Sequence, residues 1–199
     1  MFKLGITGGI GSGKTTAAIF FKHKGAIIFD ADEEAKNYLN SNIPLQNNIM
    51  KTFGSEKFDN NQFNFKQLGQ IAFSNEKNQK ILNNFIWPMV FRLIKTTANN
   101  AKKQGCNLFI VDAALLLEAG HLDFYDSILL ISASKSIRIK RIIERKNIPL
   151  EQIEKRMSLQ MNDTMKRQLA DTNIENNRDI KYLHDCLESY YENFKIRPC

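Results

Sequence analysis

The stretch Gly8-Gly9-Ile10-Gly11-Ser12-Gly13-Lys14-Thr15 fits the pattern G-x-x-x-x-G-K-[ST] at every position. It follows residues 2–7, a short apolar run typical of a β-strand, and precedes residues 15–22, whose apolar side chains recur at helical spacing. A glycine-rich turn that matches by chance is the alternative. Because the motif lies between a predicted strand and a predicted helix, we interpret it as a phosphate-binding loop.

The residue types of this loop suit nucleotide phosphates. Glycines let the backbone wrap closely around a phosphate chain, and successive N–H groups form an anion nest at the start of a helix. Lys14 reaches the β- and γ-phosphates, and the Thr15 hydroxyl is a ligand for Mg²⁺. The loop does not separate kinases from ATPases and GTPases, but the chain lacks the guanine-selecting Asn-Lys-x-Asp tetrad. We expect ATP and Mg²⁺ to bind at Gly9, Ile10, Gly11, Ser12, Gly13, Lys14, Thr15 and Thr16.

The remaining apolar runs predict an α/β fold. Runs typical of strands cover residues 26–29, 107–112, 127–131 and 172–174. Helical patterns separate them, which predicts a parallel sheet with helices on both faces.

Helical segments account for most of the rest of the chain. Residues 44–104 are mainly helical, with an Asn-rich break at 59–64, and are too long for a simple crossover. We therefore expect an inserted helical subdomain there. Two further helices are predicted at 135–146 and 150–161, joined at Asn147-Ile148-Pro149, and a last one from Arg178 to Phe194.

Carboxylates follow two of the predicted strands, at Asp30-Ala31-Asp32 and at Asp112. Ligands of open parallel sheets bind beyond the carboxyl ends of the strands. Asp32 is our candidate base for an acceptor hydroxyl, although its position also suits a helix N-cap. Asp30 is expected to support the site or a metal-bound water. Asp112 is a candidate Mg²⁺ ligand, although aspartates at strand ends are also common in turns.

Positive charge gathers in one segment. The chain has a formal net charge of +7, and residues 135–167 hold ten Lys and Arg against four Asp and Glu. Arg138, Arg141 and Arg145 share one helix face, and we expect Arg141 and Arg145 to close over the triphosphate as catalytic lid residues. A solvated basic face and an RNA-binding surface are the alternatives. The chain shows no nucleic-acid module, so we expect no nucleic-acid partner.

The composition is that of an ordinary globular protein, with 43% hydrophobic and 25% charged residues in 199. No apolar run approaches the roughly 18–20 residues of a membrane helix, so we expect no membrane partner. The three widely spaced cysteines offer no C-x-x-C pattern and no disulfide framework. These features favour a cytoplasmic location.

The ordered set of motifs resembles the dephospho-CoA kinase family over most of the chain. Residues 5–16 resemble the opening of that family, and Asp30-Ala31-Asp32 its D-A-D element. The segment Leu115-Leu116-Leu117-Glu118 is similar to its P-L-L-F-E element. Arg141 and Arg145 match its R-L-x-x-R lid helix. Gln160 matches its later Q, and Ala170, Asp171 and Asn176 match its A-D-x-x-I-x-N element.

Three departures from the family pattern are visible. Trp87-Pro88 stands where the family usually has His-Pro, Ala114 where a proline is usual, and Asn173 where an apolar residue is usual. Trp87 is expected either to pack in the core or to stack on substrate. None of the departures touches the phosphate-binding loop or the acidic and lid residues named above.

The resemblance implies a core of about residues 1–35, 105–134 and 168–199, a substrate-binding insertion of about 36–104, and a lid of about 135–167. It implies transfer of the ATP γ-phosphate to the ribose 3′-hydroxyl of dephospho-CoA, the last step of CoA synthesis. The acceptor residues implied are Asp32, Trp87, Pro88, Leu116 and Glu118. A kinase for a nucleoside or nucleotide, and a nucleotide-switched binding protein, remain alternatives. The sequence does not fix the oligomeric state.

Overall fold

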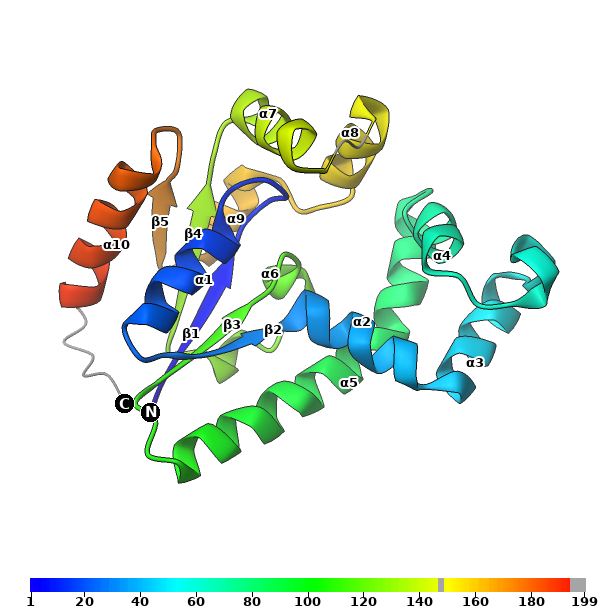
Figure 1. Ribbon diagram of the computed structural model, residues 1–199, viewed down its shortest axis with the longest axis horizontal. Helices are drawn as coiled ribbons and strands as arrows, with labels where there is room; N and C mark the ends of the chain where they lie inside the picture. Colours follow the sequence, from blue (N-terminus) through cyan, green and yellow to red (C-terminus); the bar gives the residue numbers. More distant parts are fainter. Residues whose placement is uncertain (147–148, 194–199) are drawn as a thin grey trace.

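The structure is a computed structural model that describes residues 1–146 and 149–193. Within them, five strands form one parallel sheet in the order β2-β3-β1-β4-β5 (Figure 1). The strands are β1 (Phe2–Thr7), β2 (Ile27–Asp30), β3 (Leu108–Asp112), β4 (Ser127–Ser132) and β5 (Thr172–Glu175). The phosphate-binding loop thus leaves the central strand, and β2 and β3 end beside it.

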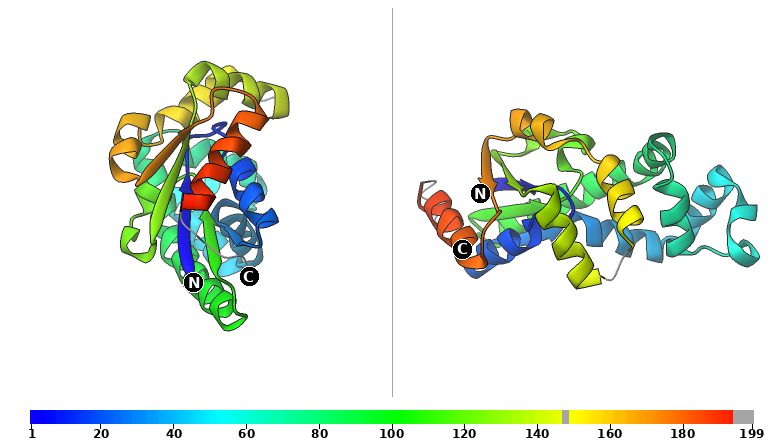
Figure 2. Two further views of the ribbon diagram at one scale, coloured as in Figure 1. Left: turned by 90° about the vertical axis from the view of Figure 1, so that its left-hand side faces the viewer. Right: turned by 90° about the horizontal axis from the view of Figure 1, so that it is seen from above.

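Helices cover both faces of this sheet, as predicted. Leu108 and Ile110 pack with α1 (Lys14–His23) and α10 (Ile180–Asn193), which lie side by side in Figure 2. The alternate residues of β3, Phe109 and Val111, pack with α5 (Glu76–Lys103) and α6 (Leu116–Ala119) on the other face. Every residue of β3 is buried, which explains its continuous apolar run.

A helical insertion separates β2 from β3. It begins directly after β2 and has its own core, which includes Ile49 and Phe53. Figure 1 shows α3 and α4 at the end of the molecule farthest from α10. Its elements before α5 are α2 (Ala31–Ser41), α3 (Ile43–Phe53), α4 (Phe65–Ala72) and two short 3₁₀ helices, Ser55–Lys57 and Asp59–Asn61.

Three helices separate β4 from β5, namely α7 (Lys135–Lys146), α8 (Leu150–Ser158) and α9 (Asp163–Leu169). The sequence did not predict α9. The helix expected to reach Met161 ends at Ser158, and the Asn162 side chain caps a new helix by accepting from Met165 N. Residues Asn147 and Ile148 of the expected junction, and Phe194 at the expected end of the last helix, lie outside the described residues.

No helix among residues 1–146 and 149–193 is long and apolar enough to cross a membrane. Cys186 is a free cysteine, and the Sγ of the buried Cys106 lies 3.2 Å from Leu108 O. The third cysteine, Cys199, lies outside the described residues, so the expectation that the cysteines form no disulfide framework stays a prediction.

Candidate active site

The phosphate-binding loop is built by backbone conformations that require glycine. Gly11 and Gly13 have φ values of 80° and 103°, in the left-handed region where a side chain causes strain. The loop is closed by a hydrogen bond of 3.0 Å from Ser12 N to Gly9 O. Gly13 precedes α1 and makes no side-chain cap, so the first N–H groups of α1 stay available for an anion.

Lys14 lies between two carboxylates. Its Nζ is 3.2 Å from Asp32 Oδ2 and 3.0 Å from Asp112 Oδ1. Burial lowers the pKa of Lys14, but the two carboxylates raise it by more, so this pKa lies above its usual value. Burial raises the pKa of Asp112, against the attraction of Lys14 and together with the repulsion from Asp30 and Asp32. The ammonium of Lys14 therefore stabilises the ionised form of Asp112, which burial at the end of β3 disfavours.

The structure corrects the expected helix cap. Asp30 caps α2 by accepting a 3.0 Å hydrogen bond from Glu33 N, so Asp32 is not the cap. Asp32 lies in the first turn of α2 with 54% of its side chain exposed, and its Oδ2 faces Lys14 and, at 3.4 Å, Ala114 N. The Asp32 carboxylate is thus free of a structural cap and open to the site.

A cavity of about 770 Å³ joins the loop to the helical insertion. Asp32, Leu116, Arg141 and Arg145 line it together with the whole stretch Gly9 to Thr16. Its far end is mainly apolar and is lined by Phe65, Leu68, Phe73, Leu82, Ile86, Trp87 and Val90, among others.

Two expected acceptor residues do not line this cavity. Pro88 is exposed on α5. Glu118 Oε1 lies 3.2 Å from Lys166 Nζ and accepts a 2.9 Å hydrogen bond from Met161 N. Glu118 thus joins α6 to the segment that precedes α9, rather than facing the cavity.

Arg141, on α7, contacts the phosphate-binding loop at Ser12. Its guanidinium lies 3.5 Å from Ser12 O, 3.3 Å from Asn176 Oδ1 and 3.3 Å from Arg178 O. The buried Asn176 also donates to Ser12 O at 2.8 Å. Partial burial and the neighbouring Arg145 lower the pKa of Arg141. Asn176 therefore ties β5, the loop and α7 together.

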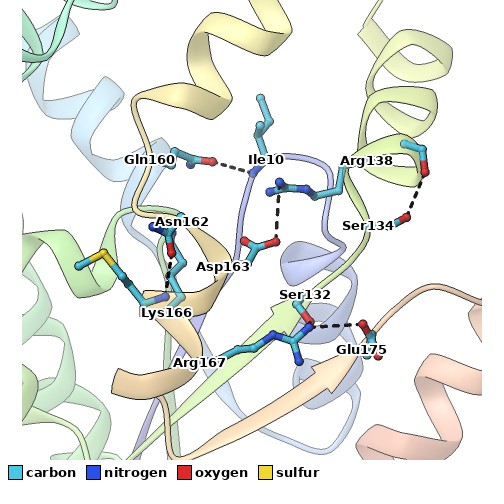
Figure 3. Close-up of polar contacts among 12 residues, drawn as sticks. Ile10, Ser132, Ser134, Arg138, Gln160, Asn162, Asp163, Lys166, Arg167 and Glu175 are labelled. Atoms are coloured by element: carbon cyan, nitrogen blue, oxygen red, sulfur yellow. Dashed lines mark hydrogen bonds and ion pairs between the residues drawn. The ribbon is translucent and has the colours of Figure 1, made fainter.

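Two further residues between β4 and α9 contact the start of the loop, at Gly9 and Ile10 (Figure 3). Gln160 Oε1 accepts a 3.0 Å hydrogen bond from Ile10 N. Arg138 has 12% of its side chain exposed, packs against Gly9, and lies 3.8 Å from Asp163 Oδ2. The sequence placed Arg138 on a basic helix face with Arg141 and Arg145 but did not predict these contacts. Its i, i+3 spacing from Arg141 was the one available signal.

The residues near Lys14 fit a Mg²⁺ ion bound with a nucleotide. Asp112 Oδ1 is buried at the end of β3 and lies 3.0 Å from Lys14 Nζ, beside the loop that receives the phosphates. Carboxylate and hydroxyl oxygens are the ligands that Mg²⁺ takes in phosphate sites, alongside phosphates and water. The same part of the chain holds no group of three or more His, Cys, Asp or Glu side chains that suits a metal. The carboxylate and hydroxyl oxygens near Lys14 thus fit a Mg²⁺ ion that binds together with nucleotide phosphates.

Comparisons with known proteins identify the family of this chain. The family model described as dephospho-CoA kinase matches residues 2–182. The dephospho-CoA kinase of Fusobacterium nucleatum is 34% identical over 190 residues, which cover 95% of this chain and 96% of that protein. That of Salinibacter ruber is 33% identical over 184 residues and 92% of both chains.

Solved structures share the fold. A Thermus thermophilus protein, TT1252, superposes with a TM-score of 0.80 at 24% identity over 98% of both chains. A dephospho-CoA kinase from Campylobacter jejuni gives 0.68 at 24% over 96% of both. A shikimate kinase from Bacteroides thetaiotaomicron gives 0.56 at 11%, over 98% of this chain and 99% of that one. With the family match over most of its length, the chain belongs to the dephospho-CoA kinase family, and it is a kinase.

Proposed function

We propose that this protein transfers the γ-phosphate of ATP to the ribose 3′-hydroxyl of dephospho-CoA and releases CoA and ADP. The observation that carries the proposal is the single cavity that joins the phosphate-binding loop and Asp32 to an apolar pocket in the insertion. A volume of about 770 Å³ is within the usual range for small-molecule sites. The polar end suits phosphates, and the apolar end suits the organic part of a long acceptor.

The N–H groups of Gly11 to Thr15 and the ammonium of Lys14 hold the β- and γ-phosphates in this mechanism. Lys14 now pairs with Asp32, and a nucleotide phosphate offers its ammonium another partner. The Asp32 carboxylate then accepts the proton of the 3′-hydroxyl. The hydroxyl oxygen bonds to the γ-phosphorus while the bond from that phosphorus to the β–γ bridging oxygen breaks, and ADP leaves.

Charge on the transferred group is neutralised from two sides. Arg141 and Arg145 approach from α7. Thr15 and Asp112 are the residues that would hold Mg²⁺, which when bound neutralises charge on the β- and γ-phosphates. Trp87 and Leu116 line the acceptor part of the cavity, and we assign no substrate contact to Pro88 or Glu118. We place the reaction in the cytoplasm, with small molecules as the partners.

The test is ADP release from ATP and Mg²⁺ with and without dephospho-CoA, with the product examined by mass spectrometry. We expect ADP release to depend on dephospho-CoA and the product to be heavier by one phosphoryl group. A panel of other alcohols, including nucleosides and nucleotides, serves as the control for acceptor choice. ADP release that is indifferent to dephospho-CoA, with no heavier product, would remove the proposed reaction.

A further inference from the structure

Lys166 is the most deeply buried charged residue near the site. Its side chain has 0% exposure, whereas lysines are almost never fully buried unless they are paired. Its Nζ lies 3.1 Å from Ala114 O and 3.2 Å from Glu118 Oε1. A buried ion pair is weak support for stability, because desolvation offsets the attraction. The two segments that Lys166 contacts therefore indicate its role better than its effect on stability does.

One contact of Lys166 leads to the acceptor wall of the cavity. Ala114 belongs to the segment 113–116 that follows β3 and lines the cavity. Its carbonyl accepts from Lys166 and its N–H faces Asp32 Oδ2 at 3.4 Å. Lys166 therefore fixes the chain segment that lies directly against the candidate base.

The other contact leads to the phosphate-binding loop. Glu118 Oε1, which pairs with Lys166, also accepts from Met161 N at 2.9 Å. The residue before Met161 is Gln160, whose side chain accepts from Ile10 N at 3.0 Å. Figure 3 shows Gln160 at Ile10 and Lys166 on the neighbouring helix α9. One ammonium thus joins the acceptor wall to the segment that touches the loop.

We propose that Lys166 is a positioning residue for phosphoryl transfer: it holds the acceptor wall and the phosphate-binding loop in one relative geometry. The inference rests on the proposed function, with Asp32 as the base. Misplacement of reacting groups by about 1 Å costs on the order of a hundredfold in rate. Lys166→Met, which keeps length and removes the ammonium, should lower kcat by about ten- to a hundredfold. The KM for ATP should change little, because Lys166 is not among the residues that line the cavity.

The neighbouring Arg167 provides the matched control. Its side chain is 45% exposed and lies 3.3 Å from both Glu175 Oε1 and Ser132 Oγ, so Arg167→Met removes a charge from the same helix without touching Ala114. A double variant, Lys166→Met/Glu118→Met, removes both buried charges and should regain the thermal stability that the single variant loses. It still leaves Ala114 O without its ammonium donor, so its kcat should stay low.

All variants are assayed below the lowest thermal midpoint, and hydrogen exchange is followed over residues 113–118. Faster exchange there in both Lys166 variants than in Arg167→Met, together with the kcat loss, supports the proposal. A double variant that recovers kcat along with stability, or a Lys166→Met protein that matches Arg167→Met, overturns it. If the wild type does not phosphorylate dephospho-CoA, the proposed function fails. The exchange data then decide separately whether Lys166 holds this segment, and equal exchange overturns the inference.

Discussion

The side chain of Lys14 illustrates how single residues prepare this site. Its ammonium lies about equally far from Asp32 and Asp112, at 3.2 and 3.0 Å. Asp112 has 1% exposure and Asp32 54%, so one carboxylate is buried and the other is open to the site. A phosphate that draws Lys14 away from this position releases Asp32, the candidate base. Binding of the nucleotide and freeing of the base are therefore linked through one ammonium.

Asp32→Asn tests whether the Asp32 carboxylate acts as the base. The amide keeps the shape of the side chain but accepts no proton, so we expect kcat to fall by about 10²- to 10⁴-fold. The Kd for ATP should change far less than kcat, because Asp32 contacts Lys14 but is not among the groups expected to hold phosphate. Steady-state kinetics and nucleotide titration measure the two effects. Glu33→Gln is the control, since Glu33 is exposed in the next position of α2; near-full activity of Asp32→Asn would exclude Asp32 as the base.

At the scale of elements, Asn176 joins three of them. Its N–H bonds Ser132 O at the end of β4, its amide donates to Ser12 O in the loop, and its amide oxygen accepts from Arg141 of α7. We expect Asn176→Ala to raise the Kd for ATP about tenfold, equivalent to about 1.4 kcal/mol. Asn177→Ala, which loses a bond to Ser134 N and none to the loop, should bind ATP nearly as the wild type does. Equal affinities of the two variants would contradict this account.

The sequence predicted strands better than it predicted contacts between elements. Continuous apolar runs such as Leu108 to Val111 mark strands that are buried on both faces, and the glycine pattern marks its own loop. Helix α9 was missed because it has only seven residues and its one fully buried side chain is a lysine. No local pattern indicates that Gln160 meets Ile10 or that Asp30 rather than Asp32 caps α2. The first contact spans 150 positions, and the second depends on where β2 ends.

Helix α10 makes the packing of the sheet sensitive to alkali. Burial raises the pKa of Tyr190 to about 12, with a smaller opposing effect from its contact with Ser127 and a further rise from Asp171. The unfolded chain ionises this phenol near its ordinary pKa of about 10. Its contribution to stability is therefore fully present below pH 10 and is lost as pH rises toward about 12.

Tyr190→Phe removes this titration. We expect the difference in unfolding free energy between wild type and Tyr190→Phe to shift by about 2 kcal/mol against the wild type between pH 10 and 12. Urea unfolding of both proteins at several pH values measures it. A difference that stays constant over that range would show that Tyr190 ionises equally in the folded and unfolded chains.

At the scale of the whole molecule, α5 links two separate cores. Its first half contributes Ile81, Leu82 and Phe85 to the core of the insertion, and its second half packs Ile94 and Ala98 against the sheet. The cavity lies between the two bodies, with the loop at one end and the insertion at the other. Substitutions in the core of the insertion should therefore weaken binding of the acceptor more than binding of ATP.

Ile49→Val and Ile110→Val compare the two cores with the same deletion of one methylene. Both isoleucines have 0% exposure, one in the insertion and one in the sheet, and each change should cost about 0.5–1.5 kcal/mol. For Ile49→Val we expect faster hydrogen exchange confined to α3, α4 and the start of α5, because local opening follows local packing. The KM for the acceptor should rise while the Kd for ATP stays unchanged. If exchange rises equally across the sheet, the insertion does not open independently, and the acceptor pocket has no stability of its own.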